Sequence, residues 1–393
     1  MKMTFSTNPQ EIQYFYSPTS VLFGIGAISQ LGMEAKRLGA TRALIITDKG
    51  VVESGLVREG IEALEAEGIK AMIFDEVEPE PPIRVVDECT KRLKSDQFDI
   101  VVGFGGGSAI DTAKAASVLI TNDRPISAYF GIDLVEKRGL PKIFIPTTAG
   151  TGSEVSRVSI LTDEKEMVKR AVFSNFLLAD VVIVDPLLTL TMPLTLTADT
   201  GIDALVHAIE AYVSKKATRF SDLLALEAIH LIGRSISKAY AKGQDIEARS
   251  NMAFASLIAG MAFSSGGLGA VHALAYPLGT AFHLPHGRSN AIMLPHVMEF
   301  NLIGNAEKFS DIAKALGEKT GHLSIRESAI RAAEIVKQIL NELCVPFKLR
   351  EYDIKQDAIP TLVEGAMKQT RLFAVNPRDL REEDLQEIYQ RAW

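Results

Sequence analysis

The hydrophobic pattern of the chain changes near Pro186, and this change constrains the fold more than any other feature. Before it, short apolar runs rich in β-branched residues alternate with stretches of helical period. The runs are 43–47, 71–74, 100–104, 143–146 and 181–184, and the helical stretches include 51–67, 84–95 and 109–120. Apolar strands that alternate with helices are typical of a parallel sheet covered on both faces. The first half therefore predicts an α/β domain.

Beyond Pro186 the strand pattern stops and only helical patterns follow. They cover residues 198–213, 221–240, 246–263, 287–301, 328–342 and 382–391. The change predicts an α/β domain over residues 1–187 and an all-helical domain over residues 188–393. Because a cleft between two such units is a usual place for a ligand, we expect a binding site there.

Composition excludes several classes of function. The chain carries a net charge of −7 and no long basic run, which argues against nucleic acid or an anionic membrane surface as the main partner. Its two cysteines, Cys89 and Cys344, cannot form a disulfide framework, and this fits a reducing cytoplasm. Residues 1–13 lack the apolar core of a secretory signal. We therefore expect a soluble cytoplasmic protein.

Residues 250–287 contain no Asp, Glu, Lys or Arg. Gly266-Gly267, His272 and Pro277 interrupt this segment, so it never offers the roughly 20 unbroken apolar residues that a membrane span needs. A pair of deeply buried helices explains the segment better.

A glycine-rich turn follows the run at 100–104. It reads Gly105-Gly106-Gly107-Ser108 and leads into a helix. A helix N-terminus presents free N–H groups and partial positive charge, and glycines let a phosphate group approach that backbone closely. A structural strand-to-helix turn would need only one or two glycines, so the sequence favours phosphate binding without naming the ligand. The turn lacks the G-x-G-x-x-G spacing of the common dinucleotide fingerprint.

Two further features are compatible with a nucleotide site. The loop 146–154 is rich in Thr, Gly and Ser, and its hydroxyls and amides suit a diphosphate or ribose as well as an ordinary turn. Asp48 ends the run at 43–47, where a carboxylate accepts hydrogen bonds from adenosine ribose hydroxyls and repels a 2′-phosphate. Asp48 is equally suited to capping the helix that follows it.

Asp203 and His207 stand four residues apart in a helical pattern, so they share one helix face. His272 lies in the charge-free segment, and His286 follows it by 14 residues. Any one of these histidines could be a hydrogen-bonded core residue, but buried together they favour a metal site. One carboxylate and three imidazoles suit Fe(II) or Zn(II) better than Mg²⁺ or Ca²⁺. Of the other histidines, His230 and His322 fit a surface position, and His283 and His296 stay ambiguous.

Several segments in order resemble one known family, the iron-containing (group III) alcohol dehydrogenases. They are Gly105–Lys114, Thr147–Glu154, Asp185-Pro186, Thr200–Tyr212, Gly260–Phe263, Gly269–His272, Pro285–Gly287 and Asn376–Arg378. The resemblance runs over nearly the whole chain. It implies an N-terminal dinucleotide-binding α/β domain with a parallel sheet and an all-helical C-terminal domain for metal and substrate, the architecture shared with dehydroquinate synthase.

The resemblance also implies an activity: metal-dependent hydride transfer between NAD(H) and a small alcohol, aldehyde or ketone, by a homodimer or larger homo-oligomer. It implies Asp203, His207, His272 and His286 as ligands of Fe(II) or Zn(II). The cofactor residues it implies are Asp48, Gly105, Gly106, Gly107, Ser108, Thr147, Thr148, Thr151 and Lys169. The apolar substrate pocket it implies is Val158, Ile160, Phe263 and Leu372. Asp48 matches a position associated with preference for NAD over NADP.

The chain departs from the family pattern at two positions that bear on the site. Tyr276 stands where many relatives carry a second histidine, four residues after the one that matches His272, and we assign it a place on the proton path. A phenol ordinarily titrates near pH 10, so it exchanges protons less readily than imidazole at neutral pH. Pro79-Glu80-Pro81 replaces the usual Pro-Asn-Pro after the third strand.

Three other functions compete with this interpretation. A maleylacetate- or hydroxyacid-type reductase would use the same chemistry on a more polar substrate. A dehydroquinate-synthase-like lyase should need a cluster of Lys and Arg for a phosphorylated carboxylate, and residues 250–287 offer none. A non-catalytic nucleotide-binding protein would have no use for the Asp203 and histidine set.

Overall fold

The computed structural model describes residues 12–166 and 168–393, which form two compact units. One unit spans Tyr16–Thr191, and the other spans Met192–Trp393 and includes the described residues up to Phe15. Phe15 stacks on Phe220 with 5.3 Å between ring centroids, which ties the early segment to the second unit. The division of function at residues 187 and 188 stays a prediction.

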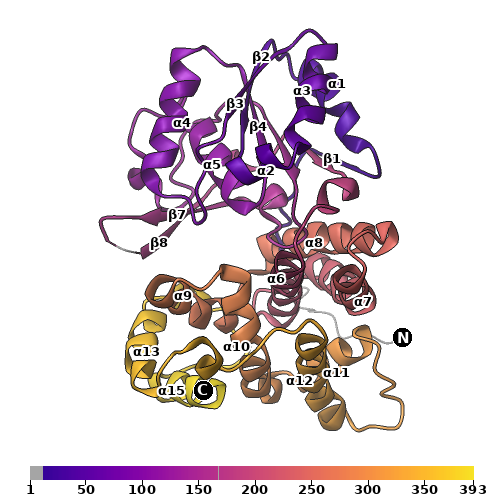
Figure 1. Cartoon of the computed structure of the whole chain (residues 1–393). Coiled ribbons are helices and arrows are strands. Elements are labelled where there is room, and N and C mark those ends of the chain that lie inside the picture. Colours follow the sequence, from indigo (N-terminus) through magenta and orange to yellow (C-terminus); the bar gives the residue numbers. More distant parts are fainter. Residues whose placement is uncertain (1–11, 167) are drawn as a thin grey trace. The chain divides into compact units, whose positions relative to one another are not determined.

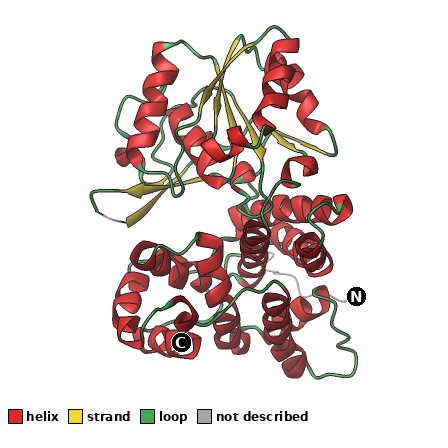
Figure 2. Ribbon diagram, in the orientation of Figure 1, coloured by secondary structure: helices red, strands yellow, loops and turns green. Residues whose placement is uncertain are grey.

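The first unit is built on a six-stranded sheet whose neighbouring strands are all parallel, as far as the described residues show (Figures 1 and 2). Its order is β1 (Ser20–Phe23), β9 (Val181–Val184), β6 (Lys142–Pro146), β4 (Ile100–Gly105), β2 (Arg42–Ile46) and β3 (Lys70–Phe74). The five apolar runs are therefore strands. The sequence analysis missed β1, an edge strand whose side chains are partly or fully exposed.

Helices cover both faces of this sheet (Figure 1). They are α1 (Leu31–Arg37), α2 (Lys49–Glu53), α3 (Leu56–Ala66), α4 (Ile83–Ser95) and α5 (Gly107–Val118). One core joins α1 and α3 to the strands and includes Leu31, Leu64 and Ile45. The helix expected over 51–67 is divided into α2 and α3 because Gly55 adopts a left-handed conformation with φ 81°.

A smaller sheet in the same unit was not expected. It has the order β5 (Gly131–Ile132), β8 (Val168–Phe173) and β7 (Val158–Asp163), with β7 and β8 antiparallel. Charged residues such as Lys169 and Arg170 obscure its strand pattern in the sequence. Its buried residues Leu161 and Val172 share a second core with Val86 and Val118 from α4 and α5.

The second unit is helical, which confirms the predicted fold class of an α/β part followed by an all-α part. Its helices are α6 (Leu194–Val213), α7 (Arg219–Ala241), α8 (Ile246–Gly266), α9 (Ala270–Phe282), α10 (His286–Asn301), α11 (Ala306–Ala315), α12 (Ile325–Glu342), α13 (Ile359–Met367), α14 (Thr370–Phe373) and α15 (Glu382–Ala392). Helix α6 packs against α7, α8 and α10, and every residue from Gly201 to Val213 is buried. The polar side chains of this stretch therefore need partners inside the protein.

The charge-free segment forms most of α8 and all of α9, two helices bent by 106° relative to each other. No single helix among the described residues is long and apolar enough to cross a membrane, although this bent pair passes the same test of length and composition. Both helices are mostly buried in the helical unit. The segment is thus the pair of buried helices that its interruptions indicated.

Candidate functional site

Four side chains in the helical unit point toward one another. Helix α6 supplies Asp203 and His207, α9 supplies His272, and the first residue of α10 is His286. One ligand atom from each of the four lies within 4.8 Å of the others. Asp203 Oδ1 is 3.8, 4.0 and 3.7 Å from the Nε2 atoms of His207, His272 and His286, respectively. The structure thus brings together all four predicted metal ligands.

The electrostatics of this cluster favour a cation. Burial alone would raise the pKa of Asp203, but the positive charge that the three imidazoles carry when protonated, together with the Asn290 amide, outweighs it. The pKa of Asp203 therefore lies below the ordinary value, and a bound cation would act in the same direction. Asn290 Nδ2 lies 2.7 Å from Asp203 Oδ1 and 3.2 and 3.3 Å from the Nε2 atoms of His272 and His286. One amide NH₂ group, with two hydrogens, therefore faces a carboxylate oxygen and two ring nitrogens that can all act as acceptors.

The donor set fits a divalent ion. Three imidazole nitrogens and one carboxylate oxygen are the ligands that Zn(II) and Fe(II) accept in proteins, and neutral imidazole is the form that binds a metal. Asp203, His207 and His272 are buried, and His286 is partly exposed. The set therefore combines three buried ligands with one ligand nearer the surface.

The remaining histidines lie outside this cluster. His296 is buried, with Nε2 3.1 Å from the Phe347 carbonyl oxygen, and burial lowers its pKa to about 4. His283 ends α9 in a left-handed conformation with φ 55°. His230 Nδ1 lies 3.3 Å from the Ala315 carbonyl oxygen, and His322 is exposed. The two histidines left ambiguous by the sequence thus have positions apart from the cluster.

Two aromatic side chains lie beside the four-residue cluster. The Phe263 ring is 4.6 Å from the His207 ring, centroid to centroid. The Tyr276 ring lies 6.3 Å from that of His272 and 5.9 Å from that of His286. The positions of Phe263 and Tyr276 are therefore compatible with the roles predicted for them, which stay predictions.

The other residues predicted for the substrate pocket are distributed over both units. Leu372 belongs to α14 in the helical unit and is buried. Val158 and Ile160 are partly buried residues of β7, two positions apart on the same face of the strand. Their contribution to one pocket stays a prediction.

In the α/β unit, the two loops predicted to bind a cofactor pack against each other. Gly105 has φ +154°, and Gly106 precedes α5 without a side-chain cap. A Cβ atom on Gly107 would lie 3.0 Å from Thr151 Cγ2, so the loops approach closely there and a larger residue would require Thr151 to shift. The Thr147 N–H donates to the Gly105 carbonyl, at 3.1 Å, and adds a second tie.

The loop pair retains groups that suit a phosphate. The Thr148 hydroxyl oxygen is buried and has no hydrogen-bond partner among the described residues. It lies 3.9 Å from the position that a Cβ on Gly106 would occupy, beside the uncapped N-terminus of α5. A helix N-terminus with an adjoining hydroxyl that lacks a partner is compatible with a bound diphosphate.

Asp48 combines both of the roles considered for it. Its Oδ1 accepts a hydrogen bond from Val51 N–H at 3.1 Å and caps α2. Its Oδ2 is 3.6 Å from the position of a Cβ on Gly105, so the same carboxylate borders the glycine-rich turn. Capping is therefore present, and it leaves the second oxygen for another contact.

Ser108 and Lys169 both contact Glu80, the residue that departs from the family's Pro-Asn-Pro pattern. Ser108 Oγ accepts a hydrogen bond from the Glu80 N–H at 3.2 Å, and Lys169 Nζ pairs with Glu80 Oε1 at 2.6 Å. Glu80 has φ 54°, a conformation rare for residues other than glycine and asparagine. The loop between β3 and α4 therefore connects two predicted cofactor residues.

A buried ion pair, Lys114 and Asp111, supports the Thr- and Gly-rich loop at residues 146–154. Lys114 of α5 is fully buried, and its Nζ donates to the Ser153 and Ser156 hydroxyls at 3.0 Å and to the Val158 carbonyl at 2.6 Å. Asp111 accepts from the Ser153 hydroxyl and from the Ile160 N–H. Burial raises the pKa of Asp111 and lowers that of Lys114, while the charge of each opposes the shift of the other.

Sequence reasoning also missed Glu210, which hydrogen-bonds to His272. Asp203, His207 and Glu210 stand at i, i+4 and i+7 and therefore share a helix face, a signal present in the sequence. A glutamate on a helix usually faces solvent, and this ordinary expectation concealed the signal.

Two family models cover most of the chain. Residues 18–186 match the model described as "Iron-containing alcohol dehydrogenase". Residues 197–393 match the model described as "Fe-containing alcohol dehydrogenase family, C-terminal". The two matches fall on the α/β and helical units, respectively.

Individual proteins of this kind are similar over nearly their whole length. Long-chain-alcohol dehydrogenase 1 of Geobacillus thermodenitrificans is 45% identical over 373 residues, which are 94% of each chain. A crystal structure of 1,3-propanediol oxidoreductase shares 39% identity with a TM-score of 0.95, over 98% of this chain and 100% of that one. A sulfoacetaldehyde reductase from Bifidobacterium kashiwanohense, solved in complex with NAD+, shares 29% identity with a TM-score of 0.88, over 97% and 99% of the chains.

Proposed function

Since the chain belongs to the iron-containing alcohol dehydrogenase family, we propose that it transfers hydride between NAD(H) and a small alcohol or aldehyde at a divalent metal site. The convergence of Asp203, His207, His272 and His286 within 4.8 Å carries this proposal. Membership of the family makes the chain an alcohol-dehydrogenase-type oxidoreductase, and this removes the lyase and the non-catalytic nucleotide-binding protein from the competing functions.

The chain's own residues hold and shield the reacting centre. Asp203 supplies the one negative charge of the set, and the three imidazoles supply neutral donors. A divalent ion held there acts as a Lewis acid toward a substrate oxygen. The carboxylate and two of the imidazoles are buried, which limits the access of water to these ligand atoms. No protein nucleophile is needed, because the nicotinamide carries the redox step.

For the cofactor we propose NAD in preference to NADP. The glycine-rich turn, the buried Thr148 hydroxyl and the N-terminus of α5 supply groups for a diphosphate. Asp48 supplies a carboxylate beside that turn, which suits ribose hydroxyls and opposes a 2′-phosphate. The sulfoacetaldehyde reductase that was solved in complex with NAD+ supports this choice.

For the substrate we propose a small aliphatic alcohol or its aldehyde. The side chains assigned to the pocket, Val158, Ile160, Phe263 and Leu372, are all apolar, and apolar walls favour alkyl chains over sugars or polyacids. Relatives named for a long-chain alcohol and for 1,3-propanediol support alkyl substrates. The relative named for sulfoacetaldehyde keeps a reductase for a polar substrate as the second candidate. A homodimer or larger assembly and a cytoplasmic location stay predictions.

Metal reconstitution with a substrate series tests the proposal. The purified protein is stripped with a chelator and reloaded with Fe(II) or Zn(II) in turn. NAD+ reduction is then followed with primary alcohols of increasing chain length and with 1,3-propanediol, and NADH oxidation is followed with sulfoacetaldehyde. We expect metal-dependent NADH formation with at least one alkyl alcohol. Activity that is unaffected by removing and restoring metal would contradict the proposal, as would metal-dependent turnover of sulfoacetaldehyde alone.

A further inference from the structure

Glu210 is a buried carboxylate whose partners link a predicted metal ligand to a helix N-terminus. It lies on α6, and 5% of its surface is exposed. Its Oε2 is 2.6 Å from His272 Nδ1, and its Oε1 accepts the Val271 N–H at 2.6 Å. Within residues 12–166 and 168–393, no lysine or arginine forms a salt bridge with Glu210. Its charge therefore rests on these two short hydrogen bonds.

The two neighbours of the His272 ring indicate the same tautomer. An ionised carboxylate only accepts hydrogen bonds, so Glu210 requires a proton on His272 Nδ1. On the other side of the ring, Asn290 Nδ2 is a donor 3.2 Å from Nε2, which then acts as an acceptor. In this tautomer Nε2, which lies 4.0 Å from Asp203 Oδ1, carries no proton and is free to act as a ligand.

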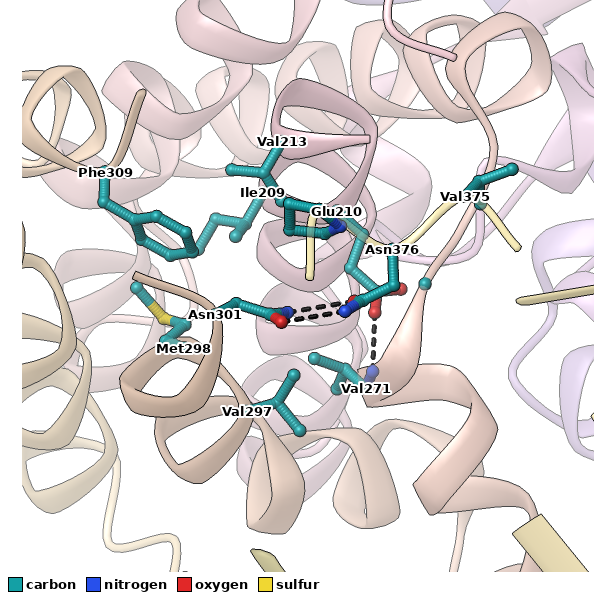
Figure 3. Close-up of a pocket in the computed structure, with 12 residues that line it drawn as sticks. Ile209, Glu210, Val213, Val271, Val297, Met298, Asn301, Phe309, Val375 and Asn376 are labelled. Carbon is teal, nitrogen blue, oxygen red and sulfur yellow. Dashed lines mark hydrogen bonds between the residues drawn. The ribbon is translucent and has the colours of Figure 1, made fainter. Parts of the chain in front are cut away.

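The surroundings of Glu210 show that this contact is built into the fold. Asn376 Oδ1 accepts the Ala270 N–H at 3.3 Å, so Glu210 and Asn376 together satisfy the first N–H groups of α9. A Cβ atom on Gly269 would lie 3.1 Å from Asn376 Oδ1 and 3.2 Å from Glu210 Oε1, so both side chains approach this glycine closely and a larger residue would require them to shift. Figure 3 shows the Glu210 and Asn376 side chains next to each other, with the hydrogen bond from the Val271 N–H to Glu210 as a dashed line.

Apolar side chains line much of a small pocket that Glu210 borders. The small pocket next to Glu210 is lined by Val213, Val297 and Phe309 among others, and Asn301 pairs with Asn376 at its edge through amide hydrogen bonds of 2.9 and 2.8 Å (Figure 3). A hydrogen bond in such surroundings is stronger than one in water, and a lost partner costs more.

We propose that Glu210 is a positioning residue of the metal site, which holds His272 in the tautomer whose Nε2 faces Asp203 and fixes the ring to the first turn of α9. The inference rests on the proposed metal site. A metal-binding histidine that donates its second ring N–H to a carboxylate is held in orientation and made a stronger ligand. Glu210 thus contributes to metal affinity without touching the ion.

Glu210→Gln tests this inference through metal affinity. If the glutamine oxygen faces His272 Nδ1, its NH₂ group opposes the Val271 N–H, which is also a donor. If the amide is reversed, its NH₂ group favours the His272 tautomer that carries a proton on Nε2 and cannot bind metal there. Both orientations weaken the site. We expect the dissociation constant for Co(II), measured on the full chain by chelator competition, to rise about 10- to 100-fold.

Asn376→Ala is the matched control. It removes the neighbouring contact with the Ala270 N–H and leaves the Glu210–His272 hydrogen bond in place. We expect it to lower the melting temperature while the Co(II) dissociation constant stays within about threefold of the parent value and the d–d absorption band of bound Co(II) is unchanged. An equal loss of affinity in Asn376→Ala and Glu210→Gln would overturn the positioning role, because any damage to the α9 N-terminus would then suffice.

Two further variants keep the test decisive. Glu210→Asp retains the charge but is one methylene shorter, and we expect it to weaken Co(II) binding at least about threefold and to shift the absorption band. The inference would be overturned if both Glu210 variants bound Co(II) with an affinity within twofold of the parent value. If Glu210→Gln does not fold, the same result in Glu210→Asp alone would overturn it. His286→Ala reports on the proposed metal site itself: if it binds Co(II) as tightly as the parent protein, the metal site is wrong. If only the Glu210 variants keep full affinity, the metal site stands and the role of Glu210 does not.

Discussion

The two units each bury a cluster of polar side chains, and the clusters differ in how their hydrogen bonds are completed. In the α/β unit, Lys114 Nζ has the Ser153 and Ser156 hydroxyls and a backbone carbonyl as acceptors. Asp111 accepts from the Ser153 hydroxyl and from the Ile160 N–H. Donors and acceptors are matched within the protein, and positive charge faces negative charge.

In the helical unit the balance is different. Asp203 Oδ1 and the ring nitrogens of His207, His272 and His286 converge, and Asn290 Nδ2 contacts three of these four atoms. Acceptors that converge on one donor are suited to a cation. The comparison teaches that burial and charge do not by themselves identify a functional cluster. An unequal number of donors and acceptors identifies such a cluster better, because a purely structural cluster can satisfy all its hydrogen-bonding groups internally.

The largest expected effect comes from removing one histidine of the four-residue cluster in the helical unit. His272→Ala and His286→Ala should each remove most bound metal and lower kcat/KM more than the 10- to 100-fold that loss of an outer partner costs. NADH binding should persist, because the predicted cofactor loops belong to the other unit. Metal analysis, steady-state kinetics and NADH titration check this. His322→Ala, at an exposed histidine of the same unit, is the control. Full metal and activity in either variant would show that the ligand assignment is wrong.

The matching test in the α/β unit is Lys114→Met, which leaves Asp111 buried without its counter-charge. Removing one partner of a buried ion pair costs about 3–5 kcal/mol of unfolding free energy. We expect a loss of this size in urea unfolding followed by far-UV circular dichroism, because Trp393, the one tryptophan, belongs to the helical unit. Metal binding should be retained. A Lys114→Met/Asp111→Asn double variant should regain part of the loss, and stability equal to the parent in Lys114→Met would contradict the closed-network interpretation.

The sequence allowed the central strands to be predicted because they are continuous apolar runs, but it concealed other elements. The edge strand β1 alternates in exposure, and β8 carries two consecutive charged residues, Lys169 and Arg170. Helices α11 and α13, with 10 and 9 residues, were also not among the predicted helical patterns. Continuous apolar runs therefore identify buried strands better than partly exposed ones.

The same contrast applies to the two clusters. The four-residue spacing of Asp203 and His207 predicts a shared helix face, and the structure shows it. Lys114 and Asp111 stand three residues apart, a spacing equally typical of an exposed ion pair, so their burial could not be read from the sequence. Burial of a charged side chain depends on tertiary packing, which here comes from residues about 40 positions further along the chain, such as Ser153.

One buried titratable group in each unit should make stability depend on pH, and the two dependences have opposite directions. Burial raises the pKa of Glu154, beside the Lys114 network, to about 7. Its usual value is near 4.5, so between these pH values the folded state holds a proton that the unfolded chain has lost. The contribution of Glu154 to stability therefore falls as pH rises from 4.5 through 7, by about 3 kcal/mol in all. Glu154→Gln should remove this dependence, which urea unfolding at pH 5 and pH 8 measures.

His296 provides the opposite trend in the helical unit. Its pKa is lowered by burial to about 4, from an ordinary 6.5, although the Phe347 carbonyl opposes the shift. The folded state keeps His296 neutral, so its contribution is fully present above pH 6.5 and is lost as pH falls toward 4, again by about 3 kcal/mol. His296→Gln, which can still donate to that carbonyl, should make stability less sensitive to acid. Identical acid limbs in the variant and the parent would contradict this assignment.

A smaller effect is expected from a change at Asp48, which borders the glycine-rich turn of the α/β unit. Asp48→Asn keeps the cap of α2, since asparagine caps helices as well as aspartate does, and it removes the charge. Hydrogen bonds to a charged group contribute about 1.5–3 kcal/mol, so we expect the ratio of kcat/KM for NAD to that for NADP to fall about tenfold or more. Asp48→Gly should act in the same direction, mainly by improving NADP. Comparable kcat/KM values for the two cofactors in the parent protein would leave Asp48 with the capping role alone.

The smallest expected effect comes from substitutions of Tyr276, which test whether this residue acts together with the four-residue cluster of the helical unit. Its ring lies 5.9 Å from that of His286, close enough to share a path for the proton released from an alcohol. A phenol ordinarily titrates near pH 10 and an imidazole near 6.5, so Tyr276→His should move the rising limb of the kcat profile toward neutral pH by about one unit. Tyr276→Phe is the control: it keeps the ring and removes the hydroxyl, so it should steepen the dependence on high pH. Metal content should stay constant in both variants, because Tyr276 lies outside the set of four ligand atoms. Superimposable pH profiles of the parent and both variants would show that the proton leaves by a route that does not include Tyr276.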